Sequence, residues 1–470
     1  MSPPDPRLWH HPAVLRADTL ADLLGGRLIA PADASLEILD LVSDSRAVTP
    51  GTGFVALPGE EMDGHAFVAD AARRGAALAV VGEAYAAGPE TPPLLIRVGD
   101  TAAALRAACS RRIGELGATV VGVTGSVGKT TAKEMCALAL AGRPTARTPG
   151  NLNTWTQIPL HVLRLVPPVE RLVVEMAMTG PGEIADLAAF THPTVGVLLN
   201  VGQAHIGRLG SEAAIADAKA ELLEALPRDG VGVVNADDPR VIGVAGRSRA
   251  PLHWFGEASR QAAWRVEAVE AGGMLGSRAT LVGPDGRASL RLRAPGRHLL
   301  LDAAAAAAVA AAFGVGVGEV AERLVEFEPA DHRGRILRGR EGSTVVDDSY
   351  NSSPSSLAAA LEVLRGSGAA DRLAIIGDML ELGDRTLAAH REAGRRAAVA
   401  ATRLIAVGAQ AAVVAGAAVA AGMPGAAVAQ AEDAGQAAEL ALPLLGPGTV
   451  VLVKGSRGIG LDAVVESLLA

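Results

Sequence analysis

A short glycine-rich segment carries the residue types that bind the phosphates of a nucleotide. It follows an apolar run, Thr119–Thr124, that predicts a buried strand, and it precedes a helical stretch. A strand, a glycine-rich loop and a helix in this order aim backbone N–H groups and a helix N-terminus at phosphate. The residues that we predict to bind nucleotide phosphates are Gly125, Ser126, Val127, Gly128, Lys129, Thr130 and Thr131.

The lysine and the first threonine of this loop have separate predicted roles. Lys129 would neutralise the β- and γ-phosphates, and the hydroxyl of Thr130 would bind Mg²⁺. The strict Walker spacing is not met, because Val123 occupies the position of its first glycine. The alternative is a glycine-rich turn that a lysine follows by chance. The strand and the helix on either side favour phosphate binding over that alternative.

Two further polar side chains follow predicted strands. Glu175 ends the apolar run 172–175, and His205 follows a strand that ends at Asn200. Ligands of open α/β sheets bind beyond the carboxyl ends of the strands, where an acid can hold Mg²⁺. Each side chain also has an ordinary interpretation, as a solvated strand-end carboxylate and as a structural loop histidine. The residue types alone leave these interpretations open.

One lysine lies on the apolar side of a predicted amphipathic helix. Lys219 is four residues after Ile215 and three before Leu222, whereas Asp217 and Glu221 take the opposite face. A lysine that faces a core must find a partner, lose its charge or extend its ammonium to solvent. The spacing therefore leaves two interpretations: a lysine that reaches solvent, and a functional lysine with a lowered pKa.

Two adjacent acids stand at the end of a later predicted strand. The segment 347–351, Asp-Asp-Ser-Tyr-Asn, follows that strand and precedes a helix that begins near Ser355. Paired carboxylates at a strand end suggest a contact with a nucleotide or a metal ion. The alternative is turn and helix-entry chemistry, which serine, asparagine and proline favour.

These residues need a scaffold that brings strand ends together, and the sequence predicts one. Apolar strand-like runs alternate with amphipathic helices, which predicts an α/β protein with mostly parallel sheets covered by helices. A hairpin signal at 284–286, Pro-Asp-Gly, predicts an antiparallel edge. We expect three domains, the last of them Rossmann-like, with the boundaries 1–98, 99–328 and 329–470.

Composition narrows the classes of function. Of the 470 residues, 49% are apolar and 20% charged, which is typical of a globular protein, and the net charge of −8 argues against broad contact with nucleic acid. Cys109 and Cys136 lie in apolar helix-like stretches, which fits a reducing cytoplasm. No secretory signal pattern is present at the N-terminus. The run 299–316 is mostly alanine, so we interpret it as a buried helix and expect no membrane insertion.

Taken together, the motifs resemble those of the Mur ligases of peptidoglycan precursor synthesis, over almost the whole chain. The phosphate loop looks like the ATP loop of that family, whose looser glycine spacing explains the failed Walker match. Further family-like segments are 151–154, 175–176, 180–184, 200–205 and 218–221. Other segments resemble the type that adds D-alanyl-D-alanine to a UDP-N-acetylmuramoyl-tripeptide. They are 43–46, 54–59, 63–65, 347–354, 377–383, His390 and 454–457.

The resemblance implies a site that draws on all three domains, which would bind the UDP substrate, ATP and the ligation partner in turn. Its implied catalytic residues are Lys129, Lys219 and His205. Its implied ligands for two Mg²⁺ ions are Thr130, Glu175, His205 and a carbamylated Lys219. Further implied ATP contacts are Asp302, Arg335 and Asp348. The implied substrate-binding residues are Ser45, Arg46, Asp63, His65, Asn153, Tyr350 and Asn351.

The chain departs from the family pattern at a few positions. Asp302 stands where asparagine is usual, at a position that the resemblance puts near the adenine. Ser352 and Ser353 replace a more usual Ala-Asn pair, and Ala177 stands where glycine is common. None of these changes removes an implied phosphate or metal ligand.

The implied reaction is an ATP-dependent, ADP-forming ligation in the cytoplasm by a monomer. The tripeptide carboxylate would attack the γ-phosphate of ATP, and the amine of D-alanyl-D-alanine would then attack the acyl phosphate. One alternative is another amide ligase, such as a tripeptide-forming Mur ligase or a folylpolyglutamate synthase. Another is a nucleotide-binding regulator without catalysis. The first domain argues against the folate enzyme, and the complete set of phosphate and metal residues argues against the regulator.

Overall fold

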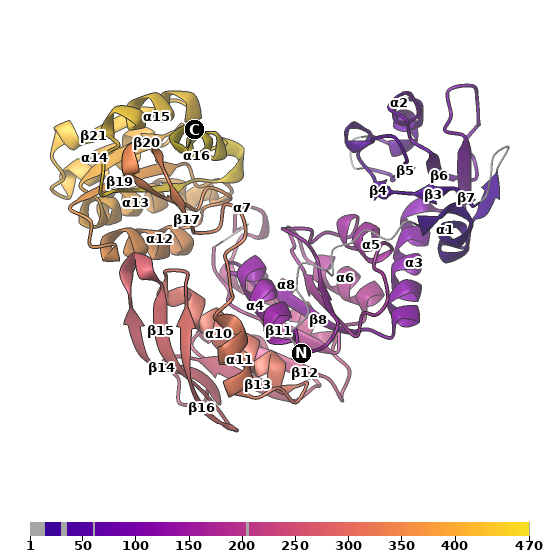
Figure 1. Cartoon of the computed structure of the whole chain (residues 1–470), viewed down its shortest axis with the longest axis horizontal. Coiled ribbons are helices and arrows are strands. Elements are labelled where there is room, and N and C mark those ends of the chain that lie inside the picture. Colours follow the sequence, from indigo (N-terminus) through magenta and orange to yellow (C-terminus); the bar gives the residue numbers. More distant parts are fainter. Residues whose placement is uncertain (1–14, 30–34, 60–61, 204–205, 470) are drawn as a thin grey trace. The chain divides into compact units, whose positions relative to one another are not determined.

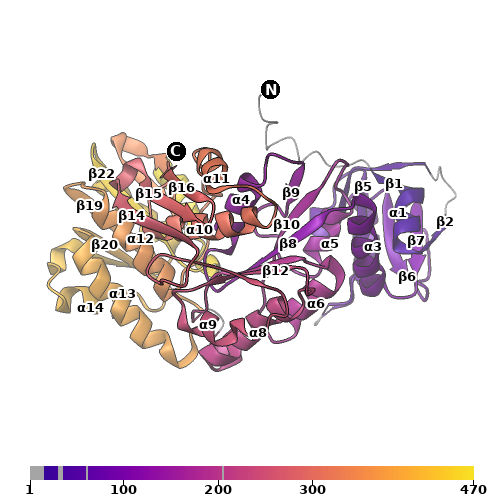
Figure 2. The same ribbon diagram turned by 90° about the horizontal axis from the view of Figure 1, so that it is seen from below.

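The computed structural model describes residues 15–29, 35–59, 62–203 and 206–469, and Figures 1 and 2 show its ribbon from two sides. The chain divides into two compact units. The first comprises 1–122, 141–177 and 184–194, and the second comprises 123–140, 178–183 and 195–470. The predicted α/β class is confirmed, because the larger sheets are mostly parallel and carry helices. Among the residues described, no helix combines the length and the apolar character that a membrane span requires.

The N-terminal sheet lies wholly in the first unit. Its strand order is β2 (Arg27–Ile29), β7 (Leu94–Val98), β6 (Leu78–Gly82), β5 (Thr52–Val55) and β4 (Asp40–Val42), with only β2 antiparallel to its neighbour. One face packs on α1 (Ala17–Leu24), α3 (Thr101–Leu116) and α5 (Gln157–Val162), and the other on α2 (Val68–Arg73). A separate short pair joins β1 (Leu15–Arg16) and β3 (Glu37–Ile38). The apolar runs 53–57, 77–81 and 94–98 predict strands, and the structure confirms them as β5, β6 and β7. The short strands at the edges were not predicted.

The central sheet has nine strands within the described residues, in the order β16-β15-β14-β13-β12-β11-β8-β10-β9. Neighbouring strands are parallel from β11 to β14 and between β9 and β10, and they are antiparallel from β14 to β16. The predicted hairpin is confirmed at the turn that joins Gly283 to Gly286. The bounds are β8 (Thr119–Thr124), β9 (Thr145–Arg147), β10 (Arg171–Glu175), β11 (Val195–Leu198), β12 (Val231–Asn235), β13 (Leu252–Gly256), β14 (Trp264–Ala271), β15 (Ser277–Gly283) and β16 (Gly286–Leu292).

The alanine-rich run forms a buried helix, as the sequence predicted. It is α10 (Arg297–Ala311), in which every residue of 303–310 is buried, and it packs against α4 (Lys129–Ala139). Small side chains allow the two helices to approach closely, so α10 braces the helix that follows the phosphate loop. The other helices of this region are α6 (Glu183–Thr191), α7 (Ile206–Leu209), α8 (Glu212–Glu224), α9 (Pro239–Ala245) and α11 (Val317–Leu324).

The C-terminal sheet lies in the second unit and has helices on both faces. Its order is β17 (Arg335–Arg338), β18 (Thr344–Asp347), β22 (Thr449–Lys454), β19 (Asp371–Gly377), β20 (Arg403–Val407) and β21 (Val428–Ala431), and only β17 is antiparallel. One face packs on α12 (Pro354–Gly366), α13 (Thr386–Ala400) and α14 (Ala411–Ala420), and the other on α15 (Ala434–Ala441) and α16 (Asp462–Leu469). The apolar runs 344–347, 372–376, 403–407 and 449–453 predict strands, and the structure confirms them as β18, β19, β20 and β22. The alanine- and valine-rich stretch 408–430 predicts a packed helix, which is confirmed as α14.

Candidate active site

The phosphate loop connects β8 to α4 and is held in shape by one asparagine. The Oδ1 of Asn200 accepts the Val127 N–H at 2.9 Å, and its Nδ2 donates to the Val127 carbonyl at 2.9 Å. The Ser126 N–H donates to the Asn200 carbonyl at 3.0 Å. Gly128 has a φ of 85°, a left-handed backbone conformation that would be strained in a residue with a side chain. Three hydrogen bonds and one glycine therefore fix the backbone that leads into the helix.

The N-terminus of α4 has the electrostatic character of an anion site. No side chain caps this helix end, so its first N–H groups and the positive end of its dipole are directed toward the loop. The Nζ of Lys129 donates to the Gly125 carbonyl at 3.0 Å, which folds the ammonium back over the loop. Thr130 is buried. The loop can thus present backbone N–H groups, a cation and a hydroxyl to a bound phosphate.

Lys219 is buried in α8, where the apolar spacing placed it. Its side chain is 2% exposed, which excludes the interpretation that it extends to solvent. Within the described residues, its ammonium takes part in no hydrogen bond or ion pair. Burial, and secondarily the charge of Lys129, hold the pKa of Lys219 well below its usual value. The lowered pKa favours the neutral amine, which is the nucleophilic form of a lysine side chain.

Glu175 and Asn153, both in the first unit, are hydrogen-bonded to each other. Glu175 ends β10 and is 2% exposed, which excludes the solvated carboxylate that the sequence left open. Its Oε1 accepts from the Nδ2 of Asn153 at 2.8 Å. Its backbone N–H donates to the Thr148 hydroxyl at 3.2 Å. Asn153, which we predicted to bind substrate, therefore orients this carboxylate in the structure.

Asp302 faces the phosphate loop from α10. A Cβ atom built on Gly128 would lie 3.2 and 3.3 Å from the two carboxyl oxygens of Asp302. The side chain is 7% exposed, and burial raises the pKa of Asp302 well above its usual value. Burial is thus the cause that favours the neutral acid beside this loop.

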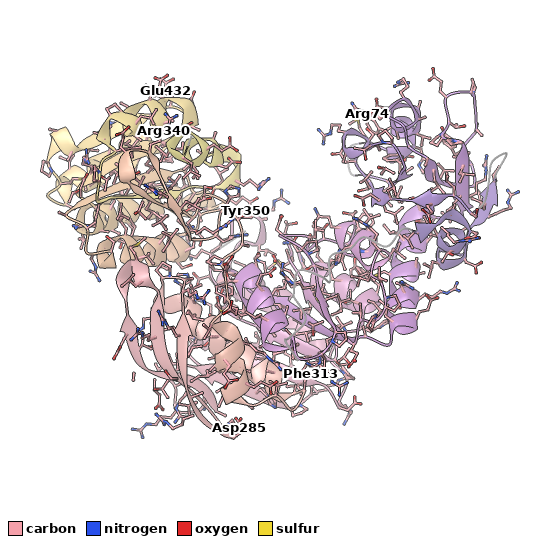
Figure 3. The ribbon with its side chains drawn as sticks, in the orientation of Figure 1. Arg74, Asp285, Phe313, Arg340, Tyr350 and Glu432 are labelled. Carbon is pink, nitrogen blue, oxygen red and sulfur yellow. The ribbon has the colours of Figure 1, made fainter. Side chains whose placement is uncertain are left out.

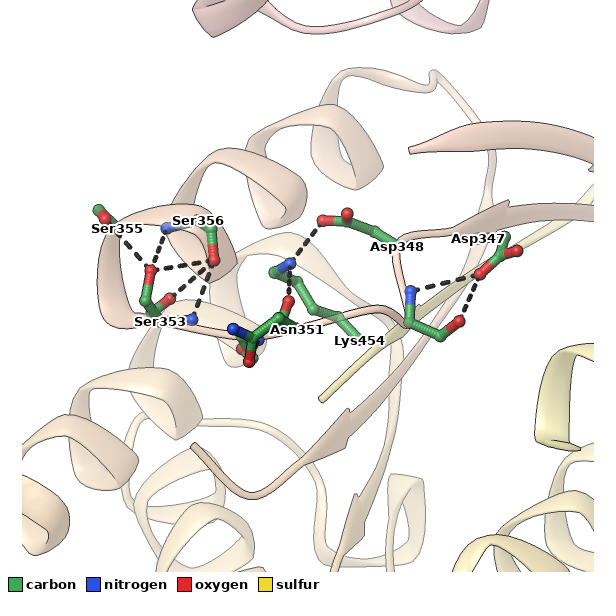
Figure 4. A network of polar contacts seen from close by, with 9 residues as sticks. Asp347, Asp348, Asn351, Ser353, Ser355, Ser356 and Lys454 are labelled. Carbon is green, nitrogen blue, oxygen red and sulfur yellow. Dashed lines mark hydrogen bonds and ion pairs between the residues drawn. The ribbon is translucent and has the colours of Figure 1, made fainter. Parts of the chain in front are cut away.

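The carboxyl edge of the C-terminal sheet holds a network around a buried lysine, which Figure 4 shows from close by. The Nζ of Lys454 lies 2.6 Å from Asp348 and donates to the Asn351 carbonyl at 2.8 Å. Lys454 is 2% exposed. The sequence pointed to both acids, but it missed this lysine as the residue that fixes the loop. Its position at the end of a continuous apolar strand was the available signal.

The remaining residues of this segment have local partners. Asp347 accepts from the Ser349 hydroxyl at 2.6 Å and lies 2.9 Å from the Nδ1 of His332. Ser353 caps α12, which is the helix-entry chemistry that the sequence offered as an alternative. Arg335, predicted to contact ATP, forms an ion pair with Asp331.

The predicted substrate residues of the N-terminal domain form two local pairs and a buried serine. Arg46 lies 2.7 Å from Asp44 and is exposed, and Ser45 is 7% exposed. The Nε2 of His65 accepts the Gly82 N–H at 2.8 Å, so its Nδ1 carries the proton and donates to Asp63 at 2.6 Å. These contacts give His65 a structural part in joining its 3₁₀ turn to the end of β6.

Among the described residues, no three His, Cys, Asp or Glu side chains lie together in a way that could hold a metal ion. His205 lies outside the described residues. Thr130 and Lys219 belong to the second unit, whereas Glu175 belongs to the first.

Comparison with known proteins identifies the family. Residues 38–119 match the Mur ligase family catalytic domain, 123–310 the Mur ligase middle domain, and 332–457 the Mur ligase glutamate ligase domain. The UDP-N-acetylmuramoyl-tripeptide--D-alanyl-D-alanine ligase of Mycobacterium tuberculosis (strain ATCC 25618 / H37Rv) is 35% identical, over 96% of this chain and 97% of its own. The enzyme of the same name from Bacillus subtilis (strain 168) is 30% identical over the same shares.

Solved structures agree with these relatives. A MurF crystal structure from Acinetobacter baumannii superposes with a TM-score of 0.85 at 28% identity, covering 97% of this chain and 99% of that one. The MurF ligase of Thermotoga maritima in complex with ADP gives a TM-score of 0.77 at 28% identity, covering 91% and 96%. The similarity thus extends over all the sheets that carry the residues described above. The chain belongs to the Mur ligase family and is an ATP-dependent, ADP-forming ligase.

Proposed function

We propose that this chain joins D-alanyl-D-alanine to UDP-N-acetylmuramoyl-tripeptide at the expense of ATP, in the cytoplasm and as a monomer. The observation that carries the proposal is the phosphate loop at α4 with a buried Lys219 near Lys129, whose pKa burial lowers, in a chain similar over its length to ligases of that name. Each of the three predicted domains would have one role. Residues 1–98 would bind the UDP substrate, 99–328 would bind ATP, and 329–470 would form the ligase domain.

The reaction balances in two steps. A carboxylate oxygen of the tripeptide attacks the γ-phosphorus of ATP, and ADP leaves with the electrons of the broken P–O bond. The amine of the dipeptide then attacks the acyl carbon, inorganic phosphate leaves, and the amine loses a proton. Lys129 and the N-terminus of α4 neutralise the anions of the first step. The main contribution of the protein is therefore to neutralise the charge of the phosphates and to position the reacting groups.

The donor chemistry of the proposed metal ligands fits Mg²⁺ once Lys219 is modified. The hydroxyl of Thr130 and the carboxylate of Glu175 supply the oxygen ligands that this ion prefers. An unmodified amine does not, whereas a carbamate formed by Lys219 and CO₂ presents oxygen, and the neutral amine allows it to form. His205 completes the proposed set. When bound, Mg²⁺ would neutralise charge on the phosphates.

The remaining proposed contacts complete the site. ATP would meet the phosphate loop together with Asp302, Arg335 and Asp348. The substrate contacts would be Ser45, Arg46, Asp63, His65, Asn153, Tyr350 and Asn351. Asn153 and His65 would in addition orient Glu175 and Asp63, since these are the groups to which they are hydrogen-bonded.

Amine-dependent phosphate release tests the proposal directly. The protein would be incubated with ATP, Mg²⁺ and UDP-N-acetylmuramoyl-tripeptide. The amine would be D-alanyl-D-alanine, glutamate or another single amino acid, each in a separate assay. We expect phosphate release and a mass increase of the UDP substrate with the dipeptide alone. Release with glutamate or with a single amino acid, but not with the dipeptide, would overturn the substrate assignment. Nucleotide binding without any release would favour a regulator.

A further inference from the structure

Two arginines meet on one tyrosine at the carboxyl edge of the C-terminal sheet. The guanidinium of Arg333 lies 3.8 Å from the ring centroid of Tyr350, and that of Arg457 lies 5.0 Å from it. A guanidinium over an aromatic face is attracted by the ring, and its N–H donors remain available at its edge. Tyr350 therefore serves as a platform that holds two cations in one place.

The platform lies where parallel sheets bind ligands. Tyr350 follows β18, and Arg457 follows β22. These two strands are parallel neighbours, with Asp347 opposite Val453, so the loops that follow them leave the same edge of the sheet. Lys454, Asp348 and Asn351 form the hydrogen-bonded floor of this edge (Figure 4).

The side chain of Arg457 has no acidic partner within the described residues, unlike two other cations of this domain. The ammonium of Lys454 is paired with Asp348 at 2.6 Å, and Arg335 is paired with Asp331. Arg457 is exposed, and within the described residues its guanidinium forms no hydrogen bond or ion pair. An arginine placed by an aromatic ring, with its donors unfilled, matches the bidentate geometry of a carboxylate.

We propose that Arg457, supported on Tyr350 beside Arg333, binds the C-terminal carboxylate of the incoming dipeptide. This inference rests on the proposed function, in which the amine substrate ends in a free carboxylate. The contact selects an amine that carries a carboxylate at its far end, and it leaves the amine itself free to attack. Other anions of the reaction, the carboxylates of the tripeptide and the phosphates of ATP, are the sources that the experiment must separate.

The test compares D-alanyl-D-alanine with its C-terminal amide in the unaltered protein and in Arg457→Ala. In the unaltered protein, we expect the amide to have a KM about 10- to 100-fold above that of the dipeptide, as the loss of a charged hydrogen-bonded pair predicts. In Arg457→Ala, the KM of the dipeptide should rise to that of the amide, and the KM of the amide should not change. Arg457→Lys should fall between, because it keeps the charge without the planar fork.

Two further measurements identify the source of the anion. The KM of the UDP-tripeptide and the Kd of ATP should be unchanged in Arg457→Ala. A rise in either one, with the dipeptide KM unaffected, would overturn the assignment and give this arginine to that ligand. An equal penalty on dipeptide and amide would also overturn it, since the effect would then not pass through the carboxylate.

The matched control is Arg340→Ala. Arg340 is an exposed arginine of the same domain, in a 3₁₀ turn that precedes β18, whereas Tyr350 follows that strand; Figure 3 labels both residues. We expect this variant to keep the dipeptide KM. If the unaltered protein does not use the dipeptide at all, the proposed function fails together with this inference. If it does, and Arg457→Ala behaves as Arg340→Ala, only the inference fails.

Discussion

Burial shifts the pKa values of two ionisable side chains near the phosphate loop in opposite directions. Burial lowers the pKa of Lys219, which favours loss of its proton, and raises the pKa of Asp302, which favours keeping it. A neutral lysine is a nucleophile, and a neutral acid can lie beside a site for anions. Burial in α8 and α10 therefore sets the chemistry that each residue can perform.

Replacing Lys219 should abolish ligation and leave the fold intact. In Lys219→Ala we expect kcat to fall by about 100-fold or more, because a proposed metal ligand is lost. Acetate or formate should restore part of the activity by occupying the vacated space with oxygen ligands. Lys219→Met fills that space and should not be rescued. Phosphate release would be measured with and without the added carboxylate. Full activity in Lys219→Ala would refute the role.

Asp302→Asn should stabilise the protein at neutral pH. The folded state raises the pKa of Asp302, so it binds a proton that the unfolded chain releases above its usual pKa. The stability contributed by this group is present at low pH and is lost as the pH rises toward the raised pKa. Asparagine does not titrate. The variant should therefore match the wild type near pH 4 and become increasingly more stable than the wild type as the pH rises toward 8.

Thermal unfolding at several pH values would check this prediction. The Tm difference between Asp302→Asn and the wild type should grow steadily as the pH increases. A constant difference would mean that the carboxyl does not change its protonation on folding. Glu326→Gln, at an exposed carboxylate of the second unit, is a suitable control and should show no such growth.

At the scale of elements, α13 and α14 pack through one glycine. A Cβ atom on Gly394 would collide with the Val414 carbonyl oxygen and would lie 2.8 Å from the Cβ of Ala417. Backbone atoms cannot move aside as a flexible side chain does. Gly394→Ala should therefore separate the helices and destabilise the protein by about 1 to 3 kcal/mol, which thermal unfolding would detect.

Gly416→Ala provides the opposite case on α14. Gly416 is exposed, and no atom lies within 4 Å of a Cβ built there. Alanine favours the helix over glycine, so this change should stabilise the protein by about 0.5 to 1 kcal/mol. If the two substitutions shifted the Tm in the same direction, the close contact at Gly394 would not be the cause of the first effect.

Local patterns predicted the elements well where one periodicity dominates. The strand and helix around Gly128, the buried alanine-rich α10 and the inward-facing Lys219 all follow from residues a few positions apart. The sequence did not predict that Asn200 would hold the phosphate loop or that Lys454 would hold the Asp348 segment. Those contacts join residues 73 and 103 to 106 positions apart, and no local periodicity records such pairings.

At the scale of the molecule, one carboxylate links the helix of Lys219 to the C-terminal domain. Glu212, at the start of α8, accepts from Gln203 at 3.0 Å and from Arg385 at 3.0 Å, and it also pairs with Arg240. A backbone bond joins Gly207 to Glu381 at 3.1 Å in the same place. The ligation domain is thus attached to the region that carries the proposed metal lysine.

Breaking this link should slow ligation without weakening nucleotide binding. In Arg385→Ala we expect kcat to fall by no more than about fivefold, the size that a partly exposed ion pair supports, because the two domains are then held less firmly during reaction. The Kd of ATP should not change, since the phosphate loop is untouched. Steady-state kinetics and calorimetry would measure the two quantities.

Arg395→Ala is the control for this change, because Arg395 pairs only with Glu392 on its own helix α13 among the described residues. High salt should slow the wild type more than Arg385→Ala, since screening weakens an ion pair that the variant already lacks. Equal salt sensitivity of the two proteins, or equal kinetics of Arg385→Ala and Arg395→Ala, would show that the Glu212 link does not help to hold the domains for catalysis. The ion pair of Arg385 with Glu212 would then contribute nothing to catalysis. The attachment of the C-terminal domain to the region of α8 would have to come from the backbone hydrogen bond between Gly207 and Glu381.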